Sequence, residues 1–214
     1  MRRKIEKQGN ILPRYDTYIK RYVQEEISEM KDKITLENVH TFSIPLSEHP
    51  LKWKFEDDNK KLSHEFEDQI IALTSPASKF LWNFENTQRY LGSISAIGKY
   101  FNEQDELSFG ENDNQKVKKW LYEKGIPFDQ KVFWITQPDW GFILTWKMVI
   151  KFSEDIFFGS DEVIWDKTLN WCLIFDHNDI FYFGKNRNFN SDKHSEEING
   201  IQKMINKNLG KAST

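Results

Sequence analysis

The chain has 214 residues and a formal net charge of −3, and its length suits one domain. With 38% hydrophobic and 15% aromatic residues it can bury a sizeable core, which excludes wholesale disorder. Cys172 is the single cysteine, so an internal disulfide and a cysteine zinc knuckle are excluded. The start lacks the apolar segment of a signal peptide, and no stretch approaches the roughly 18 apolar residues of a membrane helix. We therefore expect a soluble, cytoplasmic protein.

The net charge conceals an uneven distribution along the chain. Residues 1–24 carry seven Lys or Arg and two acids, and residues 185–214 carry six and three, so both ends are basic and residues 25–184 carry −11. An acidic body argues against nucleic acid as a partner, because phosphate binding needs clustered cations. It suits a basic protein partner, since complementary fields speed association. The alternative is that the charge serves solubility alone.

The first predicted elements are an arm, a helix and two short strands. Residues 1–14 are expected to form a flexible basic arm, and a loose apolar stripe predicts a helix over residues 15–33. Residues 41–46 are predicted to be a short strand or an extended segment. Alternating apolar and charged residues over 51–55 predict another strand.

Helices dominate the interpretation of the next part of the chain. Apolar residues spaced by four, four and three positions predict a helix over residues 58–73. Ser75 followed by Pro76 is typical of an N-cap and a first helical position, and predicts a helix to about residue 90. Residues 91–114 show no clear pattern and end in a loop. A short helix over residues 115–123, closed by a glycine, follows.

The second half of the chain is predicted to hold most of the strands. It begins with a strand over residues 132–135, a turn over 136–141 and an amphipathic helix over 142–157. Three further segments predict strands over residues 162–165, 171–175 and 180–183. A tight turn over 176–179 joins the last two as a hairpin, which Gly184 ends.

The C-terminal region completes the predicted fold. A loop is expected over residues 186–193, a helix over 195–208 and a disordered tail over 209–214. Helices thus come mostly first and an antiparallel sheet last. This order predicts a single α+β domain over residues 1–214, with a helix-rich N-terminal part packed on a C-terminal antiparallel β-sheet.

The sequence contains no recognisable catalytic apparatus. Glycine-rich phosphate loops, HExxH, GxSxG and EF-hand motifs are absent, and no two of the five histidines lie four positions apart. Cys172 falls in a predicted buried strand, which favours a core position over a reactive thiolate. We therefore predict no catalytic residue, no cofactor and no metal ion.

His177 is the residue that most invites a functional interpretation. It lies in the predicted turn with Asp176 and Asp179, and Asp161 and Asp166 are expected nearby if the strand order is simple. An imidazole beside a carboxylate could form an acid–base pair, a partial metal site or a contact with a partner. The structural alternative, which the sequence favours, is a histidine hydrogen-bonded to the backbone of the turn.

Most of the eight tryptophans fall at positions predicted to face the core rather than a stacked base or sugar. Trp140 is the exception, because it lies in the turn over residues 136–141. An exposed tryptophan is typical of an interface anchor. Adjacent carboxylates such as Asp161 and Glu162 usually mark solvated surface.

The segment from Phe142 to Gly184 resembles the C-terminal signature of small bacterial immunity proteins found beside polymorphic or contact-dependent toxins. In that signature a helix is followed by SD(D/E)-x-(V/I), an acidic turn, W-x-L-x-x-x-H-(E/N)-(D/E) and an aromatic strand closing in FG. Asn178 stands where glutamate is common in the signature, and the match covers about a fifth of the chain. The matching positions are Ser160, Asp161, Glu162, Ile164, Asp166, Trp171, Leu173, His177, Asp179, Phe183 and Gly184.

The resemblance implies a cytoplasmic bacterial inhibitor that binds and masks a cognate toxin, and the acidic body suggests a basic nuclease as that toxin. Neither a membrane nor a nucleic acid is an expected partner. One alternative is a small hydrolase that uses His177 with Asp161 or Asp179, which predicts that these side chains converge in an open cleft. Another is a regulatory or scaffold protein with a large apolar self-association patch. The predicted partner-binding residues are Trp140, Asp161, Glu162, Asp166, His177 and Asp179.

Overall fold

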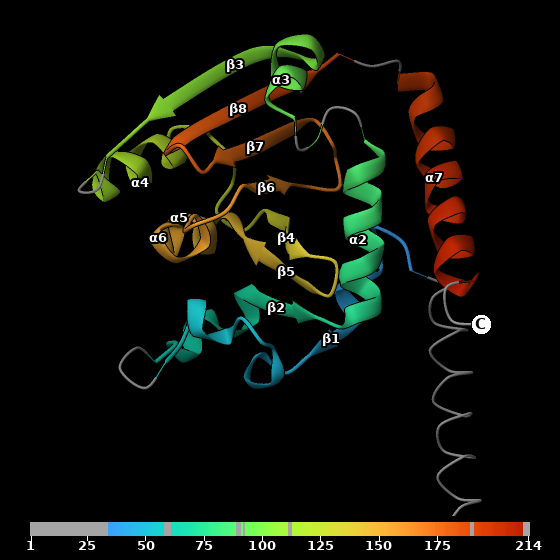
Figure 1. Cartoon of the computed structure of the whole chain (residues 1–214), viewed down its shortest axis with the longest axis horizontal. Helices are drawn as coiled ribbons and strands as arrows, with labels where there is room; N and C mark the ends of the chain where they lie inside the picture. Colours follow the sequence, from blue (N-terminus) through green and yellow to red (C-terminus); the bar gives the residue numbers. More distant parts are fainter. Residues whose placement is uncertain are drawn as a thin grey trace, which may run out of the picture.

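The computed structural model describes residues 34–57, 61–88, 91, 93–110, 113–188 and 191–211. Its centre is an eight-stranded sheet in which each pair of neighbours is antiparallel (Figure 1). From one edge to the other the strands are β1 (Ser43–Ile44), β2 (Ile70–Leu73), β5 (Trp140–Thr145), β4 (Lys131–Gln137), β6 (Glu162–Trp165), β7 (Trp171–Asp176), β8 (Ile180–Arg187) and β3 (Phe101–Ser108).

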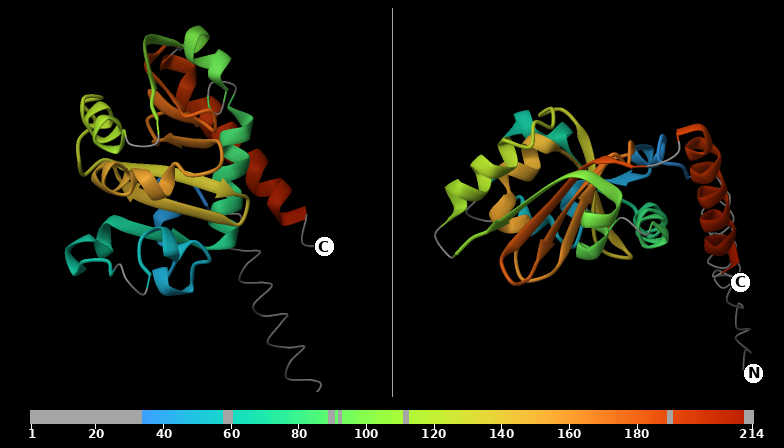
Figure 2. Two further views of the ribbon diagram at one scale, coloured as in Figure 1. Left: turned by 60° about the vertical axis from the view of Figure 1, so that its left-hand side comes forward. Right: turned by 90° about the horizontal axis from the view of Figure 1, so that it is seen from above.

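Helices cover both faces of the sheet, and the view from above in Figure 2 shows the resulting layers. One face carries α2 (Ser75–Thr87) and α7 (Ser191–Lys211), which contact each other. The other carries α4 (Asn114–Tyr122), α5 (Trp146–Lys151) and α6 (Ser153–Ile156). A further helix, α3 (Ile94–Tyr100), leads directly into β3. The 3-10 helices before β2 are η1 (Val39–Thr41), η2 (Leu46–Glu48), η3 (Lys52–Lys54) and η4 (His64–Gln69).

The central strands are buried on both faces, which gives the molecule two cores. In β7, Trp171, Leu173 and Phe175 join the core under α4, α5 and α6, whereas Cys172 and Ile174 join the core under α2 and α7. This alternation follows from the two-residue period of a strand. A continuous apolar run is typical of strands that are covered on both sides.

Several predicted elements are confirmed. β6 spans the predicted residues, and β7 and β8 form the predicted hairpin. The α2 helix begins at the predicted place, although its N-cap is Thr74, whose side chain accepts a hydrogen bond from the N–H of Ala77. The helix predicted over residues 115–123 is α4, and Gly125 closes it with a left-handed φ of 68°.

The α+β class and the antiparallel sheet are confirmed, but the expected division into a helix-rich N-terminal part and a C-terminal sheet is wrong. Helices and strands are interspersed along the chain, from β1 and β2 near its start to α7 near its end. The strands of the sheet come from the whole described chain, because short segments pair with strands that are distant in the sequence.

Three local predictions are wrong, and strand pairing explains two of them. Residues 70–73, predicted to be helical, form β2, whose apolar residues pair with β1 on one side and β5 on the other. The segment 142–157, predicted to be one helix, begins as part of β5, which pairs with β4. Only the residues after β5 are helical, and they form α5 and α6. Pairing across the sheet overrides the helical spacing of these two short apolar runs. The third error is different, because Lys52–Lys54 form the 3-10 helix η3 within the strand expected over residues 51–55.

Gly184 does not end the last strand, as the sequence suggested, because β8 continues to Arg187. A Cβ atom at position 184 would lie 2.6 Å from two ring carbons of Phe101. The glycine therefore makes room for the aromatic ring with which β3 begins.

The C-terminal helix is longer than predicted. α7 starts at Ser191 and ends at Lys211, so it takes in part of the loop expected over residues 186–193 and part of the tail expected over 209–214. Leu209 is buried against the core, which accounts for the ordered end. The arm and helix predicted over residues 1–33 lie outside the described residues. None of the described helices has the length and apolar character needed to cross a membrane.

Candidate functional site

The turn between β7 and β8 holds two of the predicted partner-binding residues. Asp176 pairs with Ile180, which leaves a three-residue loop. Asp179 closes it with a left-handed φ of 60°, a conformation that aspartate tolerates. The Asp176 carboxylate accepts hydrogen bonds from the backbone and side-chain nitrogens of Asn178 at 2.9 and 2.6 Å. The sequence DHND therefore forms a tight turn that its own side chains stabilise.

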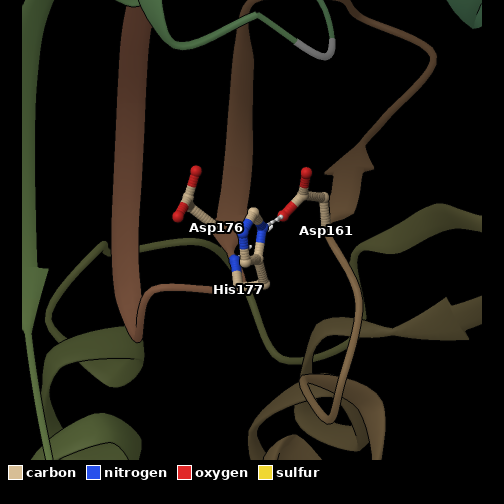
Figure 3. Close-up of side chains that lie close together, drawn as sticks. All are labelled: Asp161, Asp176 and His177. Carbon is tan, nitrogen blue, oxygen red and sulfur yellow. Dashed lines mark hydrogen bonds and ion pairs between the residues drawn. The ribbon is translucent and has the colours of Figure 1, made fainter.

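His177 and Asp161 meet at the surface beside this turn (Figure 3). Asp161 directly precedes β6, and its Oδ1 lies 2.7 Å from Nδ1 and 2.9 Å from the backbone nitrogen of His177. The pairing of β6 with β7 places the two residues side by side. The structure thus places His177 beside Asp161, as the sequence predicted for a simple strand order.

Each member of the Asp161–His177 pair stabilises the charged form of the other. Hydrogen bonds from the backbone and then the ring of His177 lower the pKa of Asp161 below its ordinary value. The bond to Asp161, followed by the charges of Asp161 and Asp176, raises the pKa of His177 above 6.5. The two side chains are 60% and 61% exposed, so solvent screens the pair and its contribution to stability is small.

Asp161, Asp176 and His177 place possible ligand atoms within 4.8 Å of one another, an arrangement that could hold a divalent cation or pass a proton. These atoms already stabilise the turn, because Nδ1 of His177 binds Asp161 and the Asp176 carboxylate binds Asn178. Catalytic pairs usually lie in concave sites that exclude water. Here both members of the pair project into solvent, and the geometry is that of a hydrogen-bonded turn.

Glu162 and Asp166 lie inside the protein, each only 2% exposed. The carboxylate of Glu162 accepts hydrogen bonds at 2.8 Å from the indole nitrogen of Trp134 and from the hydroxyl of Ser160. Asp166 accepts from the indole nitrogen of Trp171 at 2.9 Å and from the backbone of Thr168. These two predicted contact residues therefore satisfy buried donors and offer no surface to a partner.

A third buried carboxylate repeats this pattern. Glu85 on α2 accepts a hydrogen bond from the indole nitrogen of Trp165 at 2.7 Å. Burial raises its pKa to about 8, and the pKa of Glu162 is raised for the same reason. Lys54 lies close to Glu162 and donates to the backbone carbonyl of Asp155 at 2.6 Å. Acidic residues in this interior hold tryptophan side chains in fixed positions.

Two further residues singled out in the sequence are Trp140, a predicted partner contact, and Cys172, a predicted core residue. Trp140 begins β5 at the β4–β5 turn and is half-buried, so it is less exposed than the turn composition suggested. Cys172 is fully buried, and burial raises the pKa of its thiol, which disfavours a reactive thiolate as the sequence indicated.

The surface that sequence reasoning missed is β3. Residues 102–106 are all exposed, although they belong to a strand. Among them Glu103, Asp105 and Glu106 line one edge of the sheet, and Asp105 forms an ion pair with Lys124, whose amine lies 3.7 Å from the centre of the Trp120 ring. Polar residues with low strand propensity hid this element. The available signal was a polar run bounded by Phe101 and Leu107.

Comparison of the chain with protein-family models, curated proteins and solved structures finds no match in any of the three.

Proposed function

We propose that this chain is an immunity protein, a non-enzymatic inhibitor that binds a cognate bacterial toxin in the cytoplasm and masks it. The observation that carries the proposal is the acidic sheet edge, where Glu103, Asp105 and Glu106 of β3 face solvent. A nuclease toxin holds its substrate with cationic side chains, since phosphate binding requires them. An acidic surface competes with the nucleic acid for those cations and speeds the encounter between inhibitor and toxin.

The resemblance of residues 142–184 to immunity proteins supports the same proposal. Its signature residues lie on β6, β7 and β8 and in the loops beside these strands. Among them, Glu162, Asp166 and Trp171 are buried, and hydrogen bonds join each carboxylate to a tryptophan indole nitrogen. The buried signature residues therefore support a shared scaffold, and the contact surface has to be sought among exposed residues such as those of β3.

The hydrogen bond between Asp161 and His177 favours hydrolysis as a second candidate function. In that case His177 acts as the base and Asp161 orients its ring. His177→Gln and Asp161→Asn separate the two functions, because a hydrolase loses its effect with either change. An inhibitor that binds through another surface keeps its protective effect.

The direct test is co-expression with the product of the adjacent gene. We expect a complex that survives purification. Cells that produce the toxin should grow only when they also produce the chain. If the chain neither co-purifies with that product nor restores growth, the immunity function is rejected. If protection requires the His177 ring but no stable complex forms, the second candidate is favoured.

A further inference from the structure

We propose that β3 is the docking edge of this protein, and that its ligand is an extended segment of the partner, rich in lysine or arginine, which joins the sheet as an additional strand. This inference rests on the proposed function, because it identifies the part of the surface that receives the partner. It also makes a claim about binding mode that can fail on its own.

The backbone of β3 is available for such pairing. β3 pairs with β8 from Phe101 to Ser108. The carbonyl of Phe101 accepts a hydrogen bond from the side-chain amide of Gln104 at 3.4 Å, but within the described residues no strand pairs with the other side of residues 102–108 (Figure 1). Seven residues extend over about 24 Å. The opposite edge, β1, has two residues. An edge strand presents a row of unpaired N–H and C=O groups, and β3 is long enough to pair with a full strand of another protein.

The two faces of the sheet each have a hollow beside β3. The register places Asp105 opposite Phe183 on the α4 side and Glu106 opposite Tyr182 on the α2 side. The hollow on the α4 side is lined by Glu103, Gln104, Asp105, Glu123, Lys124, Phe183 and Lys185. The hollow on the α2 side is lined by Ile97, Gln104, Asp105, Glu106 and Tyr182.

These hollows suit an added strand, because alternate side chains of a strand point to opposite faces of its sheet. Backbone hydrogen bonds then provide affinity, and the hollows select the side chains of the ligand. An extended segment fits this arrangement better than a helix does, since a helix cannot pair with the exposed backbone of β3.

Charge decides what kind of segment fits. The exposed acids at this edge are Glu103, Asp105, Glu106 and the neighbouring Glu123. They outnumber the two lysines of the hollow on the α4 side, of which Lys124 is buried and paired with Asp105 and Lys185 is half-buried. Cationic side chains of a partner strand would lie beside these carboxylates. A second copy of β3 would instead place acids against acids, which destabilises cross-strand pairs. The same acids that prevent self-association therefore favour a basic partner.

The test uses the full chain and three capped eight-residue peptides. The first alternates lysine and valine, the second alternates glutamate and valine, and the third is the lysine peptide with alternate backbone nitrogens methylated. Backbone amide signals of the ¹⁵N-labelled protein are followed during titration with each peptide. We expect the lysine peptide to shift and protect amides within residues 101–108, and the other two to have no such effect.

Matched variants assign the effect to the acidic edge. Glu103→Gln with Glu106→Gln should weaken binding of the lysine peptide about five-fold, the loss expected for two exposed ion pairs. Glu65→Gln with Glu67→Gln, which removes two exposed acids on η4 far along the sheet, should leave it unchanged. Glutamine keeps the acceptor that Asn186 uses at Glu103.

The outcomes separate strand addition from the immunity function. Shifts confined to β3 and abolished by backbone methylation support docking at this edge. If the lysine peptide leaves residues 101–108 unperturbed, or if the methylated peptide binds equally well, strand addition is rejected even when the chain protects cells from the toxin. If the peptides bind as expected but no complex forms with the adjacent gene product, the edge is a binding site and the immunity function fails.

Discussion

Carboxylates occupy two contrasting environments in this molecule. In the interior, Glu85, Glu162 and Asp166 each accept a hydrogen bond from a tryptophan indole nitrogen. On β3, Glu103 and Glu106 face water at the edge of the sheet. The interior acids determine how the rings pack, because an indole N–H left without an acceptor in the core costs free energy. The edge acids contribute little to stability and leave their charge available to a partner.

Acidic residues therefore have two physical roles in this molecule. Glu162 and Asp166, beside β6, belong to the scaffold, whereas the acids in the polar run of β3 belong to the surface. The two roles predict different responses to mutation and to pH.

Glu85 is expected to make stability depend on pH. Burial raises its pKa from the ordinary 4.5 to about 8 in the folded protein, so between these pH values the folded state holds a proton that the unfolded state has released. The free energy of unfolding therefore falls as pH rises through this window, by about a few kcal/mol. Denaturant unfolding at pH 5 and pH 9 measures the fall. Glu85→Gln, which keeps an acceptor for Trp165, should reduce it, and an equal fall in this variant would contradict the assignment.

Glu162→Ala should destabilise the protein by about 3 kcal/mol, because it leaves the indole nitrogen of Trp134 and the nearby amine of Lys54 without their carboxylate. The matched change on the edge is Glu106→Ala, which should alter the free energy of unfolding by less than about 0.5 kcal/mol. Urea denaturation of both variants measures the comparison. Equal effects at the two positions would remove the distinction between interior and edge acids.

Gly184→Ala should destabilise the protein by about 2 kcal/mol, because the added Cβ collides with the ring of Phe101 and displaces the start of β3. Gly98→Ala is the control, since among the described residues its Cβ would meet only Gln104, at 3.6 Å, and alanine favours the α3 helix. Thermal unfolding should show a lower Tm for the first variant and an unchanged or higher Tm for the second. A similar Tm in both would show that Phe101 does not depend on the glycine.

The smallest effect concerns His177. Its pKa is raised by Asp161, so any stability from the pair is present below pH 6.5 and is lost as pH rises through the folded pKa. Asp161→Asn should bring the pKa of His177 back towards 6.5 with little change in the free energy of unfolding, because solvent screens the pair. A ring-proton NMR titration measures the shift. An unchanged pKa in this variant would show that Asp161 does not set the charge of the ring.

The sequence predicted the strands β6, β7 and β8 well and the strands β2 and β5 poorly. β6, β7 and β8 are aromatic-rich runs joined by recognisable turn residues, so local pattern and final structure agree. β2 and β5 are short apolar runs whose spacing also fits a helix, and pairing with each other and with β1 and β4 decides their conformation. The pairing of β2 with β5 joins residues about 70 positions apart and leaves no local signal.

The candidate site was predictable in part. The contact of His177 with Asp161 follows from the hairpin register, which the turn over residues 176–179 indicates. Burial of Glu162 and Asp166 could not be predicted, because it depends on which tryptophan indoles point towards them across the sheet. The exposed edge was hidden as well, since an acidic strand looks like a loop until its partner β8 is known.

Amide hydrogen exchange of the chain, alone and in complex with the product of the adjacent gene, shows whether β3 receives the partner. We expect complex formation to slow exchange in residues 101–108 and to leave exchange in the turn over residues 176–179 unchanged. Slower exchange at that turn, with β3 exchanging as fast as in the chain alone, would contradict docking at β3.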